Sequence, residues 1–66
     1  MNKYKAEFKI AEKIYLEIIT STKDDLIKAI CLNNLGTMAN YSYISYEKAL
    51  QYLKDSYSLY KNLYKN

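Results

Sequence analysis

The residues of this 66-residue chain that could carry out chemistry are one cysteine, Cys31, and scattered carboxylates and tyrosines. A reactive thiol needs a nearby base or cation to lower its pKa, but the sequence contains no histidine and no arginine. Zinc sites use several cysteine and histidine ligands, so one cysteine alone does not make one. We therefore interpret Cys31 as a core residue and expect no enzymatic activity, no metal and no cofactor.

Two pairs of carboxylates could in principle act as acid and base, Glu12 with Glu17 and Asp24 with Asp25. Glu12 and Glu17 alternate with lysines, as expected on a solvated helix face. Asp24 and Asp25 follow a polar break, where acidic side chains favour the start of a helix. Both pairs are thus accounted for by helix solvation and capping.

The nine tyrosines could stack on nucleic-acid bases. Seven of them lie in the second half of the chain: Tyr41, Tyr43, Tyr46, Tyr52, Tyr57, Tyr60 and Tyr64. Single-strand binders also need a basic groove, whereas ten lysines here interleave with seven acids for a net charge of +3. This argues against nucleic-acid binding, and the tyrosines suit core edges and a protein interface. A small regulator or inhibitor acting on nucleic acid or on a nucleic-acid enzyme remains the alternative function.

Helical periodicity dominates the chain, which has no proline and one glycine. Apolar residues at spacings of three and four predict helices over about residues 3–20, 23–40 and 45–64. The faces expected to be buried are Tyr4, Phe8, Ala11, Ile14, Tyr15, Ile18 and Ile19; then Ile27, Ile30, Cys31, Leu32, Leu35, Met38 and Ala39; then Tyr46, Ala49, Leu50, Leu53, Tyr57, Tyr60 and Leu63 or Tyr64.

Polar breaks separate these segments and provide helix caps. Ser21 or Thr22 is a candidate cap for the second helix, and Ser45 for the third, with Glu47 in its first turn. The second segment is apolar around most of its circumference, so we expect it to lie between the other two. The sequence therefore predicts one all-α domain over residues 1–66, built from three antiparallel helices.

Gly36 lies inside the second predicted helix, where glycine costs about 1 kcal/mol relative to alanine. We expect it to let the third helix approach closely, with Ala49 as its small partner. A glycine that ends the second helix early is the alternative. Because Met38 and Ala39 continue the apolar pattern, close packing is the favoured interpretation.

The segment Leu32-Asn33-Asn34-Leu35-Gly36, followed by Tyr46-Glu47-Lys48-Ala49 and Leu53, resembles a tetratricopeptide repeat. Leu35 and Gly36 match the family's Leu-Gly pair, and Ala49 matches its small residue in the second helix of the repeat. Leu32 and Leu53 stand where the family has large aromatic residues. The resemblance spans residues 29 to about 61, and the preceding helix adds about half a repeat.

This resemblance implies a helical hairpin that binds a partner protein or peptide on the first helix of the pair. The polar strip there consists of Asn33, Thr37 and Asn40, with Tyr41 beside it, and side-chain amides suit a peptide backbone. A merely solvated strip is the alternative. Asn34 is expected to be a buried amide that bonds to a neighbouring turn.

We also expect the chain to self-associate, most simply as a dimer, because the apolar residues exceed one face per helix. Ile10 and Leu16 fall outside the apolar stripe of the first helix. Tyr52 and Leu59 are predicted to face away from the apolar side of the third helix. A foreign partner would satisfy the same surface. The free thiol and the charged start of the chain predict a cytoplasmic protein without a membrane segment.

Overall fold

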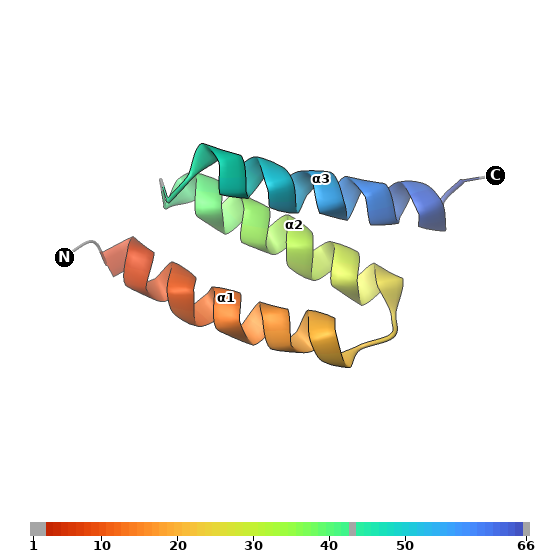
Figure 1. The fold of residues 1–66 in the computed structure, drawn as a ribbon, viewed down its shortest axis with the longest axis horizontal. Helices are drawn as coiled ribbons and strands as arrows, with labels where there is room; N and C mark the ends of the chain where they lie inside the picture. Colours follow the sequence, from red (N-terminus) through yellow and green to blue (C-terminus); the bar gives the residue numbers. More distant parts are fainter. Residues whose placement is uncertain (1–2, 43, 66) are drawn as a thin grey trace.

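The computed structural model describes residues 3–42 and 44–65, and within them the chain forms three α-helices. These are α1 (Lys3–Ser21), α2 (Asp25–Tyr41) and α3 (Tyr46–Leu63) (Figure 1). The predicted all-α class is confirmed. The side chain of Tyr4, and Tyr43 as a whole, lie outside the described part of the chain.

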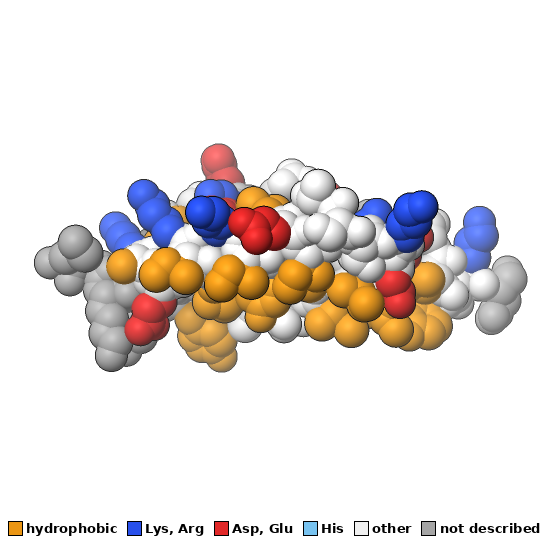
Figure 2. Space-filling view, turned by 90° about the horizontal axis from the view of Figure 1, so that it is seen from below, with side chains coloured by type: hydrophobic (Ala, Val, Ile, Leu, Met, Phe, Trp, Pro, Cys, Tyr) orange, Lys and Arg blue, Asp and Glu red, His pale blue; other side chains and the backbone are white. Residues whose placement is uncertain are grey.

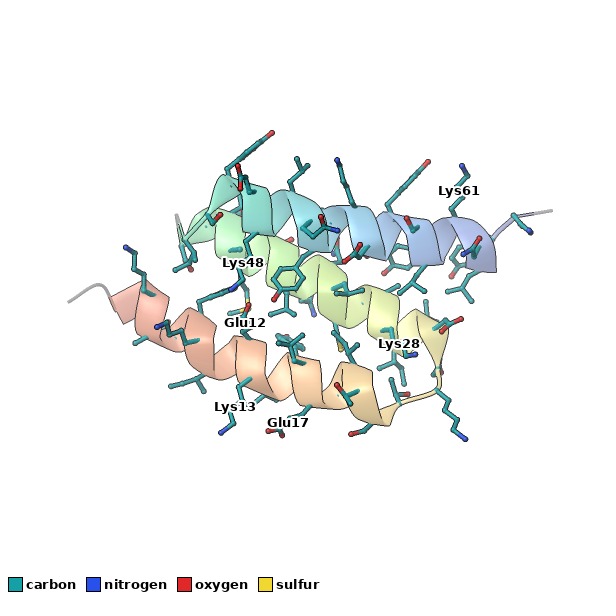
Figure 3. The ribbon with its side chains drawn as sticks, viewed as in Figure 1. Glu12, Lys13, Glu17, Lys28, Lys48 and Lys61 are labelled. Carbon is teal, nitrogen blue, oxygen red and sulfur yellow. The ribbon has the colours of Figure 1, made fainter. Side chains whose placement is uncertain are left out.

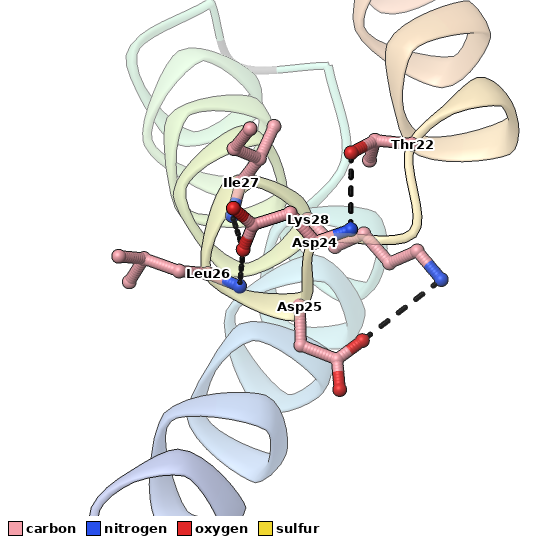
Figure 4. A network of polar contacts seen from close by, with 6 residues as sticks. All are labelled: Thr22, Asp24, Asp25, Leu26, Ile27 and Lys28. Carbon is pink, nitrogen blue, oxygen red and sulfur yellow. Dashed lines mark hydrogen bonds and ion pairs between the residues drawn. The ribbon is translucent and has the colours of Figure 1, made fainter.

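The caps explain where α2 and α3 begin. Asp24, and neither Ser21 nor Thr22, caps α2: its Oδ1 accepts hydrogen bonds from the Leu26 and Ile27 amides at 2.9 and 3.4 Å (Figure 4). Thr22 instead accepts a bond from the Asp24 amide at 3.1 Å. A carboxylate at this position binds the free amides and also meets the positive end of the helix dipole.

Ser45 caps α3 as predicted. Its hydroxyl oxygen accepts a hydrogen bond from the Lys48 amide at 3.1 Å, and Glu47 lies in the first turn. The link before it ends with a backbone bond from the Ile44 amide to the Ala39 carbonyl, which fixes how the chain leaves α2. Two short, hydrogen-bonded turns therefore hold neighbouring helices antiparallel.

The helices form a single flat layer of about 46 × 23 × 12 Å, with α2 in the middle (Figure 1). α2 packs against both α1 and α3, and its contact with α3 is the more extensive. A layer one helix thick leaves two broad faces. The two faces of this layer differ in character, and that difference defines the candidate site.

Small residues bring α2 and α3 together. Ala29 and Gly36 on α2, and Ala49 and Ser56 on α3, are all buried and lie seven residues apart on each helix. The Ser56 hydroxyl donates a 2.7 Å hydrogen bond to the carbonyl of Ala29. We call this contact of small residues between α2 and α3 the seam. Close approach of this kind increases van der Waals contact between the two backbones.

The core is small and lies where the three helices meet. Its buried members are Phe8, Leu35, Ala39 and Ala49, and around them pack the partly buried Tyr15, Ile19, Met38, Ile44 and Tyr52. Phe8 and Leu35 are the largest side chains that are fully buried. Phe8 comes from α1, so its ring helps to attach α1 to the hairpin.

The inner face predicted for α3 was right for Ala49 and Tyr60 and wrong for its other members. Tyr46, Leu50, Leu53, Tyr57, Leu63 and Tyr64 are exposed, whereas Tyr52, Leu59 and Tyr60 are half-buried. Tyr52, predicted to face outward, packs against the core. The reason is that Ala49 and Ser56 set the contact with α2, and this turns the larger apolar side chains to one side of the seam.

The inner faces of α1 and α2 were right only in part. Phe8, Cys31, Leu35 and Ala39 are buried, but Ile14, Ile18, Ile27 and Ile30 are exposed. Ile10 and Leu16 are exposed as predicted. In a flat layer α1 and α3 flank α2 at its edges, and neither covers the broad face of the layer. Apolar residues on that face therefore stay at the surface.

Candidate interaction surface

One face of the layer carries a polar cluster that joins α1 to α3 across α2. Glu12 Oε2 accepts a 2.5 Å hydrogen bond from the Tyr52 hydroxyl and forms a 2.9 Å ion pair with Lys48 Nζ. The Lys48 ammonium also lies 5.7 Å from the centre of the Phe8 ring. In Figure 3, Glu12 and Lys48 point toward each other between the two outer helices.

The cluster shifts the titration of two of its members. Burial acts to raise the pKa of Glu12, but the hydrogen bonds from Tyr52 and Lys48 and the positive charges of Lys48 and Lys9 outweigh it, so this pKa lies below its ordinary value. Burial, then the bond to Glu12 and its negative charge, raise the pKa of Tyr52 well above its ordinary value. Glu12 is therefore held ionised and Tyr52 neutral.

The opposite face is apolar, and its members follow from the turn of each helix. On α1, steps of three residues turn by about 60°, so Glu12, Tyr15 and Ile18 succeed one another around the helix. Tyr15 points to α2, because its hydroxyl accepts a 3.4 Å hydrogen bond from Asn34. Glu12 and Ile18 must then emerge on opposite faces of the layer.

The same reasoning places the exposed residues of α2 and α3. On α3, Lys48 lies to one side of the α2-facing residues Ala49 and Ser56, and Leu53 lies to the other. On α2, Ile30 points well away from the buried Leu35. We call this surface the apolar face and define it by its exposed members Ile14, Ile18, Ile30, Leu50, Leu53 and Tyr57.

Figure 2 shows much of this separation: lysine side chains gather along one side of the layer and hydrophobic side chains along the other, with some acidic side chains among the hydrophobic ones. α2 contributes no charged residue after Lys28. An exposed surface with this many large apolar side chains is typical of a binding surface or an aggregation site.

The predicted polar strip lies within the apolar face. Asn33, Thr37 and Asn40 are exposed on α2, and so is the neighbouring Tyr41, at 76%. The Thr37 hydroxyl donates a 3.0 Å bond to the Asn33 carbonyl one turn earlier, whereas the two amides face solvent. The structure thus brings these four residues together on one surface; their role in binding stays a prediction.

The other residues singled out in the sequence are buried or make contacts between helices. Leu35, Gly36 and Ala49 are buried between helices, Leu32 is half-buried, and Leu53 covers Gly36 from the exposed side. Asn34 is half-buried and bonds to Tyr15 of α1, a neighbouring helix where a neighbouring turn was expected. Cys31 is a free, buried thiol whose pKa is raised by burial.

Sequence reasoning missed two features. Glu12 was interpreted as solvated, because nothing in a single sequence links it to Lys48 and Tyr52, far along the chain. Ser56 was overlooked, although its place seven residues after Ala49 is the signal that could have identified a small-residue seam. The surface residues Leu50, Leu53 and Tyr57 were taken for core because large apolar residues at helical spacing usually are.

Comparisons with protein-family models, with curated proteins and with solved structures gave no match. Among the residues described, no helix combines the length and apolar character needed to cross a membrane.

Proposed function

We propose that this chain is a non-enzymatic protein-interaction module of tetratricopeptide-like design, which binds a partner protein or peptide through its apolar face. The observation that carries the proposal is the exposure of Ile14, Ile18, Ile30 and their neighbours on one side of a thin layer. Water contact with so many large apolar side chains is unfavourable, and a bound partner would remove it.

The pattern of the hairpin supports the tetratricopeptide-like description. The Leu35-Gly36 pair and Ala49 lie where α2 meets α3, as the resemblance implies for the two helices of one repeat. In such a repeat the first helix lines the binding surface, and here α2 presents Asn33 and Asn40 on the apolar face. Their amides would bond to the partner while the flanking isoleucines and leucines are buried. The free thiol of Cys31 is compatible with the cytoplasm.

The test is site-specific photo-cross-linking in the cells that make the protein. A photoreactive amino acid placed at position 30 samples the apolar face, and one placed at position 16 is the control. Ile30 and Leu16 are matched in exposure, 44% and 40%, but Leu16 lies with Lys13 and Glu17 on the outer edge of α1. We expect position 30 to capture a discrete protein and position 16 to capture none. Equal labelling at the two positions would count against a binding face.

The exposed rings of Tyr46, Tyr57 and Tyr64 favour the alternative of a small regulator or inhibitor acting on nucleic acid or on a nucleic-acid enzyme, since base stacking needs accessible rings. Direct nucleic-acid binding would lose affinity steeply as salt is raised. Measuring the affinity for a single-stranded oligonucleotide at low and at high salt separates nucleic-acid binding from an apolar protein contact.

A further inference from the structure

The chain exposes more surface than a folded monomer of its size is expected to expose. The chain exposes 5128 Å², whereas a folded monomer of its 7.8 kDa is expected to expose about 4,400 Å². The excess of about 700 Å² is close to the roughly 800 Å² that each partner buries in a standard protein interface. One interface of ordinary size would therefore bring this chain to the exposure of a normal folded protein.

The edges of the layer are poor candidates for that interface. The outer edge of α3 presents the exposed polar residues Glu47, Lys54, Ser58 and Lys61, so a further helix would find no apolar surface there. Lys13 and Glu17 point away from the layer at the edge of α1 (Figure 3). A partner is therefore expected on the apolar face.

The face is also broad. It extends over all three helices of a layer measuring 46 × 23 Å, whereas a single helix is about 10–12 Å across. One bound peptide helix would leave much of the apolar face in water. A second layer of the same dimensions would cover it completely.

The chemistry of the face is complementary to itself. Beyond Lys28, α2 in the middle of the layer carries no charged residue that would repel its own copy. The amides of Asn33 and Asn40 each supply donors and acceptors, so they can bond to the same groups of a second chain. A two-fold contact requires this self-complementarity.

We propose that the apolar face binds a second copy of this chain, giving a two-layered, six-helix dimer in which α2 packs on α2 of the partner and the two-fold axis passes near Thr37. This names the partner of the proposed function and rests on it. Thr37 lies at the centre of the polar strip, so a two-fold contact that pairs the two strips brings Thr37 beside its own copy.

Charge variants at position 37 test this contact. Thr37 is exposed, and Thr37→Asp and Thr37→Lys are tolerated by an exposed helix position. Each variant alone places like charges on both sides of the axis, and we expect its dimer dissociation constant to rise on the order of 100-fold. Mixing the two variants in equal amounts should restore a dimer, because opposite charges then face each other.

Sedimentation equilibrium at micromolar concentration provides the readout, with circular dichroism confirming that each variant stays helical. We expect wild type, Leu16→Lys and the Thr37→Asp/Thr37→Lys mixture at twice 7.8 kDa, and each Thr37 variant alone at 7.8 kDa. A dimeric wild type whose mixed variants remain monomeric would overturn the proposed axis.

A monomeric wild type would overturn the dimer, and the cross-linking at position 30 then shows whether the proposed function fails with it. Capture of a different protein at position 30 by a monomer would overturn this inference and leave the interaction module intact. The absence of any capture would overturn both. A monomer that cosediments with phosphatidylglycerol vesicles would assign the face to a lipid surface and overturn both as well.

Discussion

Gly36 of α2 lies directly beneath the side chain of Leu53 of α3. A Cβ atom at position 36 would stand 2.6 Å from Leu53 Cγ and 3.1 Å from the carbonyl oxygen of Ala49. The first distance is too short for two non-bonded carbon atoms, so a side chain at position 36 would force the Leu53 side chain to move. This contact explains why the sequence keeps a residue of low helix propensity inside α2.

Gly36→Ala should therefore destabilise the chain by about 1 kcal/mol, because displacing Leu53 outweighs the gain in helix propensity, and Gly36→Leu should cost up to about 3 kcal/mol. Leu53→Ala removes the atoms in the way, so Gly36→Ala should be close to neutral in that background. Urea unfolding of the two single variants and the double variant measures this coupling. An additive pair, or a Gly36→Ala variant more stable than wild type, would contradict the contact.

Ser56 should tolerate little change. Ser56→Ala loses the hydrogen bond to the Ala29 carbonyl and should cost about 1 kcal/mol, and Ser56→Val should cost more because it also forces the helices apart. Ser58, exposed on the same helix, is the control: Ser58→Ala should change the unfolding free energy by less than about 0.5 kcal/mol. Equal effects at positions 56 and 58 in thermal melts would mean that the seam is not tightly packed.

The cap of α2 makes a prediction about two adjacent aspartates. Asp24→Ala removes the acceptor of two amide bonds and should cost about 1 kcal/mol. Asp25→Ala should cost less, since its ion pair with the half-buried Lys28 spans 4.0 Å and the Asp25 side chain is exposed. Both contacts can be followed in Figure 4. Chemical unfolding that ranks Asp25→Ala as the more damaging change would show that the cap is misassigned.

Acid should weaken the attachment of α1 through Glu12. The pKa of Glu12 is lower in the folded chain than its ordinary value of 4.5, so its contribution to stability is present above that value. The contribution is lost as the pH falls through the lowered pKa. Glu12→Gln should thus flatten the dependence of the unfolding free energy on pH below about 4.5. Glu17→Gln, which alters a carboxylate on the outer edge of the same helix, is the control; an identical pH profile for Glu12→Gln and wild type would rule the cluster out as a source of stability.

The sequence was sufficient to predict the helices, their order and the cap at Ser45, because periodicity and capping are local properties. The face that each helix buries was harder to predict. On α3 the large residues Leu50, Leu53 and Tyr57 form the most prominent stripe, but small Ala49 and Ser56 determine the packing. A hydrophobic pattern identifies what is apolar, and it does not distinguish a core from an uncovered interface.

The candidate site could also be predicted only in part. Asn33, Thr37 and Asn40 were correctly grouped, because residues at those spacings share one side of a helix wherever the helix lies. The contact of Glu12 with Lys48 and Tyr52 depends on how α1 lies beside the hairpin, which no local spacing encodes. The outward assignment of Tyr52 was wrong for this reason, whereas self-association itself remains to be measured.

The most direct measurement of whether the apolar face is covered is the relaxation of side-chain methyl groups by a soluble paramagnetic probe. Ile30 and Leu16 are almost equally exposed in the single chain, at 44% and 40%, so a free monomer would show equal relaxation at the two sites. We predict that in the protein isolated under native conditions Ile30 is protected several-fold relative to Leu16, because a partner lies on the apolar face. Equal enhancement at Ile30 and Leu16 would contradict the account.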